Sequence, residues 1–130
     1  MNGIYTKPKL LVVDDEVEVC SILKEFLAAQ FIIEIAHDGA SALQKAETLK
    51  PDIVLLDIRM PVMGGEQALK KIKSSLPNTQ IIMLTAIGSN AIAEKCLKEG
   101  AFRYIMKPVD LDILEDAINS ALKAKGQTTL

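Results

Sequence analysis

The chain has 130 residues, of which 49% are hydrophobic and 25% charged, and its formal net charge is −2. This length suits one ordinary domain, and this balance excludes a disordered or fibrous protein. The slightly negative charge, without a basic stripe, argues against direct nucleic-acid binding. No apolar run reaches the length of a membrane span, and the stretch MNGIYTKPK lacks the apolar core of a signal peptide, so we expect a cytoplasmic protein without a membrane partner.

Apolar runs alternate with segments of helical periodicity along the whole chain. The runs predict strands at 9–13, 31–36, 52–56, 80–84 and 102–106. The segments between them predict helices at 16–29, 40–49, 65–75, 89–98 and 110–123. This alternation indicates an α/β fold on a five-stranded parallel sheet with five helices. The run FIIEIA has a polar residue on one face, which suits an edge strand, so we expect the doubly wound, flavodoxin-like order 2-1-3-4-5.

The predicted elements form one domain without an internal repeat or a low-complexity segment. We place this domain at 9–123, after an N-terminal extension at 1–8. The stretch at 124–130 is polar and reads as a tail or as the stub of a linker. The sequence therefore leaves open whether the domain stands alone or was cut from a longer protein.

The two cysteines and the single histidine do not form a metal-binding pattern. Cys20 and Cys96 lie far apart in helix-like segments without a C-x-x-C spacing, so we expect buried, reduced thiols. His37 has no second His or Cys near it in the sequence, which favours an exposed loop or turn position over metal ligation.

Polar residues stand where four of the predicted strands end. KLLVVDDE ends the first run in Asp14 and Asp15, DIVLLD ends the third in Asp57, QIIMLT ends the fourth in Thr85, and Lys107 follows the fifth. In an open parallel sheet, ligands bind outside the carboxyl ends of the strands, where the strand order reverses. We therefore expect these side chains to meet in one crevice.

Each of these residues also has an ordinary structural explanation when it is taken alone. Asp14 or Asp15 could cap the first helix, and Asp57 could begin a turn. Thr85 could cap the next helix, and a lone lysine such as Lys107 is usually a surface residue. The functional interpretation depends on their joint placement at one end of one sheet.

The expected crevice has the composition of a phosphoryl-transfer site. Three clustered carboxylates repel one another, and a divalent cation would remove that repulsion. Mg²⁺ prefers carboxylates, water and phosphate oxygens, and neither Cys nor His stands at these positions to attract a softer metal. A metal ion, a hydroxyl group and an ammonium group can each hold an oxygen of a transferring phosphoryl group. A central carboxylate can then serve as the nucleophile and form an aspartyl phosphate.

The motifs VVDDE, LLDIRMPVMGG, MLTA and KEGAFRYIMKP, in this order and spacing, resemble the receiver domain of two-component response regulators. The resemblance extends over nearly the whole chain, from about Lys9 to Leu122. It implies that Asp57 is the phosphoacceptor. It also implies that Asp14, Asp15 and Asp57 bind Mg²⁺, with Mn²⁺ as an alternative, together with the backbone carbonyl of Arg59.

The resemblance also assigns roles around the phosphoryl group. It implies that Thr85 and Lys107 hold phosphoryl oxygens, so that Asp57, Thr85 and Lys107 form the catalytic set. It implies a cis peptide bond between Lys107 and Pro108. It further implies that Thr85 and Tyr104 are the switch residues, although Tyr104 on its own reads as a core aromatic.

The implied function is a phosphorylation-activated signalling switch. A sensor histidine kinase or a phosphotransfer protein would donate the phosphoryl group to Asp57. The change would reach a downstream output domain or protein through the surface formed by helix 89–98, strand 102–106 and helix 110–123. Such a domain catalyses only its own phosphorylation and dephosphorylation and is not an enzyme with a separate substrate. The cognate kinase, the signal and dimerisation are left open.

The chain departs from the family's pattern at Gly64-Gly65, where we expect no loss of chemistry, and two further positions, Arg59 and Ile87, bear on the lifetime of the phosphoryl group. Family members often have Asp-Gly or Asn-Gly where this chain has Gly64-Gly65, so we expect looser capping of helix 65–75. Arg59 and Ile87 lie two residues after Asp57 and Thr85, at places that in the family flank the phosphoryl group. We expect the bulky, apolar Ile87 to shield the acyl phosphate from water and to slow its hydrolysis.

Three alternatives compete with this interpretation. A phosphatase of the haloacid dehalogenase type needs D-x-D, but Arg59 holds the place of its second aspartate. A flavodoxin-like cofactor binder needs a phosphate-cradling loop after the first strand, whereas VVDDEVE is acidic there. A receiver-shaped interaction module that is never phosphorylated stays open, because the site residues argue against it without excluding it.

Overall fold

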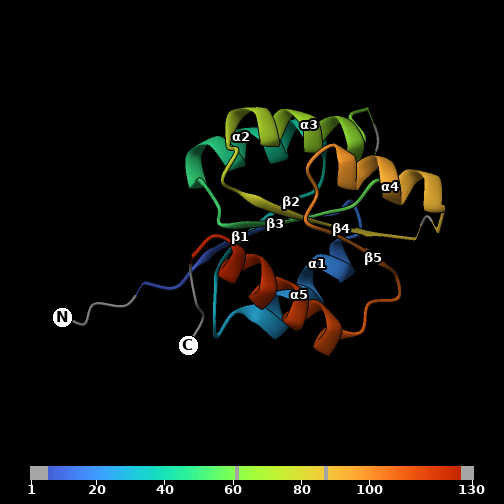
Figure 1. The fold of residues 1–130 in the computed structure, drawn as a ribbon. Coiled ribbons are helices and arrows are strands. Elements are labelled where there is room, and N and C mark those ends of the chain that lie inside the picture. Colours follow the sequence, from blue (N-terminus) through green and yellow to red (C-terminus); the bar gives the residue numbers. More distant parts are fainter. Residues whose placement is uncertain (1–5, 61, 87, 127–130) are drawn as a thin grey trace.

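The computed structural model describes residues 6–60, 62–86 and 88–126, along which five strands and five helices alternate (Figure 1). The strands are β1 Lys9–Val13, β2 Ile32–Ala36, β3 Ile53–Leu56, β4 Gln80–Thr85 and β5 Arg103–Met106. The helices are α1 Val17–Leu27, α2 Gly39–Leu49, α3 Gly65–Ser75, α4 Asn90–Lys98 and α5 Leu111–Ala124.

The sheet is parallel throughout and has the order β2-β1-β3-β4-β5, which confirms the predicted fold class. The strand order reverses at β1, which pairs with β2 on one side and with β3 on the other. Val13 lies opposite Leu56 in this register, so the residues that follow β1 and β3 leave the sheet side by side. The register therefore brings the acidic residues of two distant segments together.

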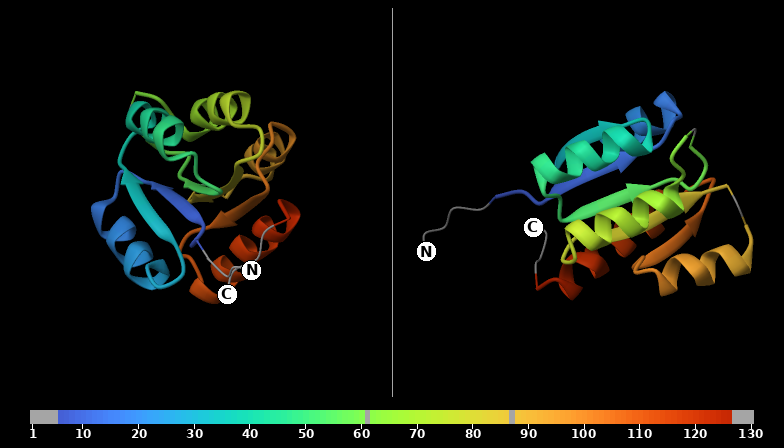
Figure 2. Two further views of the ribbon diagram at one scale, coloured as in Figure 1. Left: turned by 90° about the vertical axis from the view of Figure 1, so that its left-hand side faces the viewer. Right: turned by 90° about the horizontal axis from the view of Figure 1, so that it is seen from above.

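Helices cover both faces of the sheet (Figures 1 and 2). The side chains of α2, α3 and α4 pack on one face, and those of α1 and α5 pack on the other. β3 is buried along its whole length, whereas β2 alternates between exposed and partly buried residues, as its polar Glu34 predicts for an edge strand. Burial of this kind stabilises the fold by about 25 cal/mol for each Å² of apolar surface removed from water.

The structure refines several boundaries of the predicted elements. The first helix is shorter than predicted, and Thr85 belongs to β4 as its last residue. Two apolar residues of the predicted helices, Phe26 and Leu97, lie at the rim with 37% and 46% of their surface exposed. A helix buries only the part of its apolar stripe that faces the sheet, and this leaves the margin of the stripe in water.

The expectations for the cysteines, the histidine and the third helix are confirmed. Cys20 and Cys96 are free and buried. His37 is exposed in the bend that follows β2. Gly64 caps α3 without a side-chain hydrogen bond, as its lack of a side chain requires. Among the described residues, no helix is both long and apolar enough to cross a membrane.

Candidate functional site

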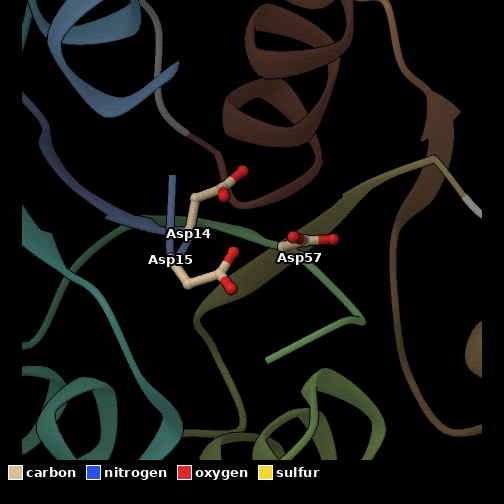
Figure 3. A group of neighbouring side chains, drawn as sticks. All are labelled: Asp14, Asp15 and Asp57. Atoms are coloured by element: carbon tan, nitrogen blue, oxygen red, sulfur yellow. The ribbon is translucent and has the colours of Figure 1, made fainter. Parts of the chain in front are cut away.

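Three carboxylates lie together beyond the carboxyl ends of β1 and β3. Asp14 and Asp15 follow β1, and Asp57 follows β3 (Figure 3). One carboxylate oxygen from each residue lies within 4.8 Å of the corresponding oxygens of the other two. The three aspartates therefore meet as predicted, and the cluster joins residues that are more than 40 positions apart in the sequence.

The buried members of this cluster experience an unfavourable electrostatic environment. Only 3% of Asp14 and 4% of Asp57 is exposed, whereas Asp15 is exposed. Burial, the largest cause, raises the pKa of Asp57; Lys107 opposes the rise, and the charge of Asp14 adds to it. The site therefore favours a partner that brings positive charge to Asp57.

Lys107 supplies part of that positive charge. It follows β5 at a cis Lys107–Pro108 peptide bond. Its Nζ lies 2.5 Å from Asp14 Oδ2, 3.2 Å from Glu16 Oε1 and 3.5 Å from Asp57 Oδ2. Desolvation lowers the pKa of Lys107, but the hydrogen bond to Asp14 and the charge of Asp57 outweigh that effect and raise it. The ammonium group therefore stays charged beside the carboxylates.

Glu16 is a member of the site that the sequence did not identify. Its carboxylate pairs with Lys107, and its backbone N–H donates to Asp14 Oδ1 at 2.9 Å. The signal was present as the third acidic residue of VVDDE. A run of acidic residues before a helix also suits ordinary solvent exposure, so the pattern did not separate Glu16 from a surface residue.

Thr85 is the last residue of β4 and contacts the cluster, and Tyr104 lies on the neighbouring strand β5. Thr85 is fully buried, and its hydroxyl forms a hydrogen bond with Asp57. Tyr104 is partly buried against the core on the α2–α3–α4 side. It also lines a surface groove of about 450 Å³ whose other residues are Gly88, Ser89, Asn90, Ala93, Leu97, Phe102, Arg103 and Met106. Thr85, at the end of β4, therefore contacts Asp57, and Tyr104 lies on the neighbouring strand β5 beside the surface groove.

The loop after β3 brings its backbone close around Asp57. The N–H of Arg59 donates to Asp57 Oδ1 at 3.3 Å, and the N–H of Gly65 donates to the carbonyl of Ile58 at 2.9 Å. A Cβ atom on Gly65 would lie 2.1 Å from the backbone oxygen of Asp57. Glycine is therefore required at position 65 by close approach of the backbone, a role that its turn-like sequence context did not reveal.

The donor set suits a hard divalent cation. The oxygens of three carboxylates converge, and two of them, those of Asp14 and Asp57, share the ammonium group of Lys107 with the carboxylate of Glu16. Such an excess of negative charge and oxygen ligands is what Mg²⁺ prefers in proteins. The arrangement could therefore bind Mg²⁺ and hold the oxygens of a phosphoryl group. Ile87, on which the prediction of slow hydrolysis depends, lies outside the described residues.

The same architecture occurs in known proteins. A model of the response regulator receiver domain family matches residues 10–119. Regulatory protein AtoC of Escherichia coli (strain K12) is 40% identical over 119 residues, which make up 91% of this chain and 26% of AtoC. Chemotaxis protein CheY of Listeria monocytogenes serovar 1/2a is 36% identical over 117 residues, which make up 88% of this chain and 98% of that protein. The chain thus spans about a quarter of AtoC and almost all of CheY.

A solved structure shows the same likeness in three dimensions. It is a CheX-CheY-BeF3-Mg²⁺ complex from Borrelia burgdorferi. The aligned chain is 34% identical with a TM-score of 0.80, and the alignment covers 86% of this chain and 87% of that chain.

Proposed function

This chain belongs to the response regulator receiver domain family, and we propose that it acts as a phosphorylation-activated switch in which Asp57 accepts the phosphoryl group. The observation that carries the proposal is the position of Asp57. Its buried carboxylate lies among two further aspartates, the hydroxyl of Thr85 and the ammonium group of Lys107. We assign the receiver unit to residues 9–123, between the extension at 1–8 and the tail at 124–130, although α5 continues to Ala124 and Lys125 pairs with Asp52.

The proposed step transfers a phosphoryl group from histidine to aspartate. The phosphohistidine of a sensor kinase or phosphotransfer protein presents its phosphorus to an Asp57 carboxylate oxygen. A P–O bond to Asp57 forms while the P–N bond breaks, and its electron pair returns to the histidine ring. Lys107 and Thr85 offer an N–H and an O–H donor to the phosphoryl oxygens. The chain thereby promotes its own modification and turns over no separate substrate.

Mg²⁺ is the cation that the site fits. Asp14, Asp15, Asp57 and the backbone carbonyl of Arg59 would hold it, with Mn²⁺ as an alternative. When bound, the ion neutralises negative charge on the phosphoryl oxygens. The Borrelia burgdorferi complex, which contains BeF3 and Mg²⁺, supports this assignment by similarity.

The proposed switch transmits the new charge to the surface of α4, β5 and α5. The phosphoryl group adds about two negative charges and strong acceptor oxygens beside the buried Thr85. Thr85 would turn to bond one of these oxygens, and Tyr104 would turn inward into the space that it leaves. The surface groove that Tyr104 lines would change shape as a result. A downstream output domain or protein in the cytoplasm would read this change.

A small-molecule phosphodonor and intact-mass spectrometry test the proposal. The chain is incubated with acetyl phosphate and Mg²⁺, and the gain of one phosphoryl group is measured. We expect wild type and Asp52→Asn to gain it and Asp57→Asn to gain none. Asp52 is a suitable control because it is also a partly buried aspartate that pairs with a lysine. Equal labelling of Asp57→Asn and wild type would refute Asp57 as the acceptor.

A further inference from the structure

Two side chains outside the proposed chemistry hold the backbone of Asp14. His37 Nδ1 lies 2.9 Å from the Asp14 carbonyl oxygen, and Cys20 Sγ lies 3.4 Å from the same atom. Cys20 Sγ also lies 3.9 Å from His37 Nδ1. A carbonyl oxygen can only accept, so the 2.9 Å contact is a hydrogen bond when the imidazole carries a hydrogen on Nδ1. The thiol is a weak donor at a longer distance, so His37 makes the stronger of the two hydrogen bonds.

The hydrogen bond from His37 acts on two carboxylates at once. The Asp14 carbonyl belongs to the peptide unit that joins Asp14 to Asp15, and this unit is planar. An anchor on its oxygen therefore restricts ψ of Asp14 and φ of Asp15, the rotations that aim both side chains. The preceding peptide unit is also fixed, because the Asp14 N–H donates to the Ala36 carbonyl at 3.1 Å. The end of β2 thus restrains both peptide units that flank Asp14.

His37 is well placed to act as an anchor because its own loop is held on both sides. It follows β2 directly, and Asp38 caps α2 by accepting a hydrogen bond from the Ser41 N–H at 2.7 Å. Gly39 packs so closely on Met63 that a Cβ at position 39 would lie 2.7 Å from the Met63 Cβ. The imidazole therefore projects from a short segment that has little freedom to move.

We propose that His37 is a positioning residue whose Nδ1–H holds the Asp14–Asp15 peptide unit so that both carboxylates face Asp57 and bind Mg²⁺. This role rests on the proposed function, since it serves the proposed metal site. His37 acts through the backbone of a ligand residue and is not itself a ligand. Partners outside the ligand set typically change metal affinity by about 10- to 100-fold when removed. We expect about 10-fold here, because His37 is exposed and water can partly replace its hydrogen bond.

Substitution by the two side-chain amides separates this role from general effects. The amide nitrogen of Asn reaches the place of Nδ1, whereas that of Gln reaches the place of Nε2. Mg²⁺ affinity of the full chain is measured by amide NMR shifts for wild type, His37→Asn, His37→Gln and His37→Ala. We expect His37→Asn to bind Mg²⁺ nearly as wild type does. We expect His37→Gln and His37→Ala to bind about 10-fold more weakly.

A second readout needs no metal. Nitrogen-15 NMR of the imidazole in metal-free wild type should show the Nδ1–H tautomer when the ring is neutral. Amide exchange at Asp15 should be faster in His37→Gln than in His37→Asn, because the peptide unit is released only in the Gln variant. Each of these results supports the anchor before any Mg²⁺ is added.

The positioning role of His37 and the proposed metal site would be refuted by different results. Equal Mg²⁺ affinity of wild type, His37→Gln and His37→Ala would overturn the positioning role and leave the proposed function intact. An Nε2–H tautomer in metal-free wild type would do the same. A wild-type chain that binds no Mg²⁺ while its imidazole is the Nδ1–H tautomer would overturn the proposed metal site instead.

Discussion

The two ends of β3 carry the same kinds of charged group in different proportions. At its amino end, Asp52 accepts a hydrogen bond from the Lys9 N–H at 2.8 Å and pairs with Lys125 at 3.1 Å. At its carboxyl end, Asp57 lies in a cluster with two more aspartates, and Lys107 pairs with Asp57 and with Asp14. The amino end has its charge balanced by neighbours within the fold, whereas the carboxyl end retains excess negative charge. The first arrangement supports structure, and the second leaves a requirement that a cation or a phosphoryl group can meet.

The largest expected effect comes from crowding the carboxyl end. Gly65→Ala would place a Cβ atom 2.1 Å from the Asp57 backbone oxygen, so the loop must move. We expect a loss of about 3 kcal/mol in the free energy of unfolding, together with weaker Mg²⁺ binding. Urea unfolding and Mg²⁺ titration measure the two effects.

Gly64→Ala is the matched control for this substitution. Its Cβ atom would lie 3.3 Å from the Ile58 carbonyl oxygen, and the residue keeps an ordinary negative φ. We expect a loss of less than about 1 kcal/mol. If both variants lose the same stability, close approach at position 65 does not explain the requirement for glycine there.

Removing the two lysines should show the difference between the ends directly. Lys107→Met leaves Asp14 and Asp57 without their ammonium partner and should lower the free energy of unfolding of the metal-free protein by about 2 kcal/mol, the usual contribution of a hydrogen bond to a charged group. Lys125→Met should cost about 1 kcal/mol, because the pair that it breaks is partly exposed. Saturating Mg²⁺ should restore much of the first loss and none of the second. Urea unfolding with and without Mg²⁺ measures both effects. Equal rescue of the two variants by Mg²⁺ would contradict the comparison.

The pH dependence of stability should also belong to the carboxyl end. Burial, with the charge of Asp14 adding to it and Lys107 opposing it, raises the pKa of Asp57 above its usual 3.8. At a pH between the usual and the raised value, Asp57 keeps its proton in the folded state and has lost it in the unfolded chain. This contribution to stability is present below the usual aspartate pKa and disappears as the pH rises through the raised pKa. Urea unfolding in a chelator should show this loss of stability with rising pH in wild type and in Asp52→Asn. If Asp57→Asn shows the same loss, a group other than Asp57 causes it.

The smallest effect is expected away from both ends of the sheet. Lys70 and Glu99 form an ion pair at 2.9 Å between α3 and the end of α4, and 60% of the lysine side chain is exposed. Glu99→Gln should change the free energy of unfolding by no more than about 0.5 kcal/mol and leave phosphoryl acceptance unchanged. A change above about 2 kcal/mol would mean that a pair with one exposed partner contributes as much as the pairs at the ends of β3, and it would weaken the comparison.

The sequence predicted the strand order and the meeting of the three aspartates because both follow from local patterns. Apolar runs of strand length recur between helical segments, and the residue that ends each run must lie at the carboxyl end of the sheet. Asp14, Asp15 and Asp57 could therefore be placed together without a structure.

Other features of the site could not be predicted, because they depend on contacts between distant segments. Glu16 meets Lys107 across 91 positions of the chain, and the spacing within VVDDE does not encode that contact. The requirement for Gly65 arises from the path of the loop around Asp57. His37 was correctly expected to be exposed, yet its hydrogen bond to Asp14 depends on how β2 ends beside β1.

The most direct test of the central claim is a titration with beryllofluoride and Mg²⁺ followed by backbone amide NMR. Beryllofluoride stands in for the phosphoryl group on a carboxylate. We predict saturable, Mg²⁺-dependent shifts around Asp57, Thr85 and Tyr104, no shifts around Asp52, and no response in Asp57→Asn. A wild-type chain that binds Mg²⁺ but shows no response to beryllofluoride would contradict the claim, and the domain would then be an interaction module that is never phosphorylated.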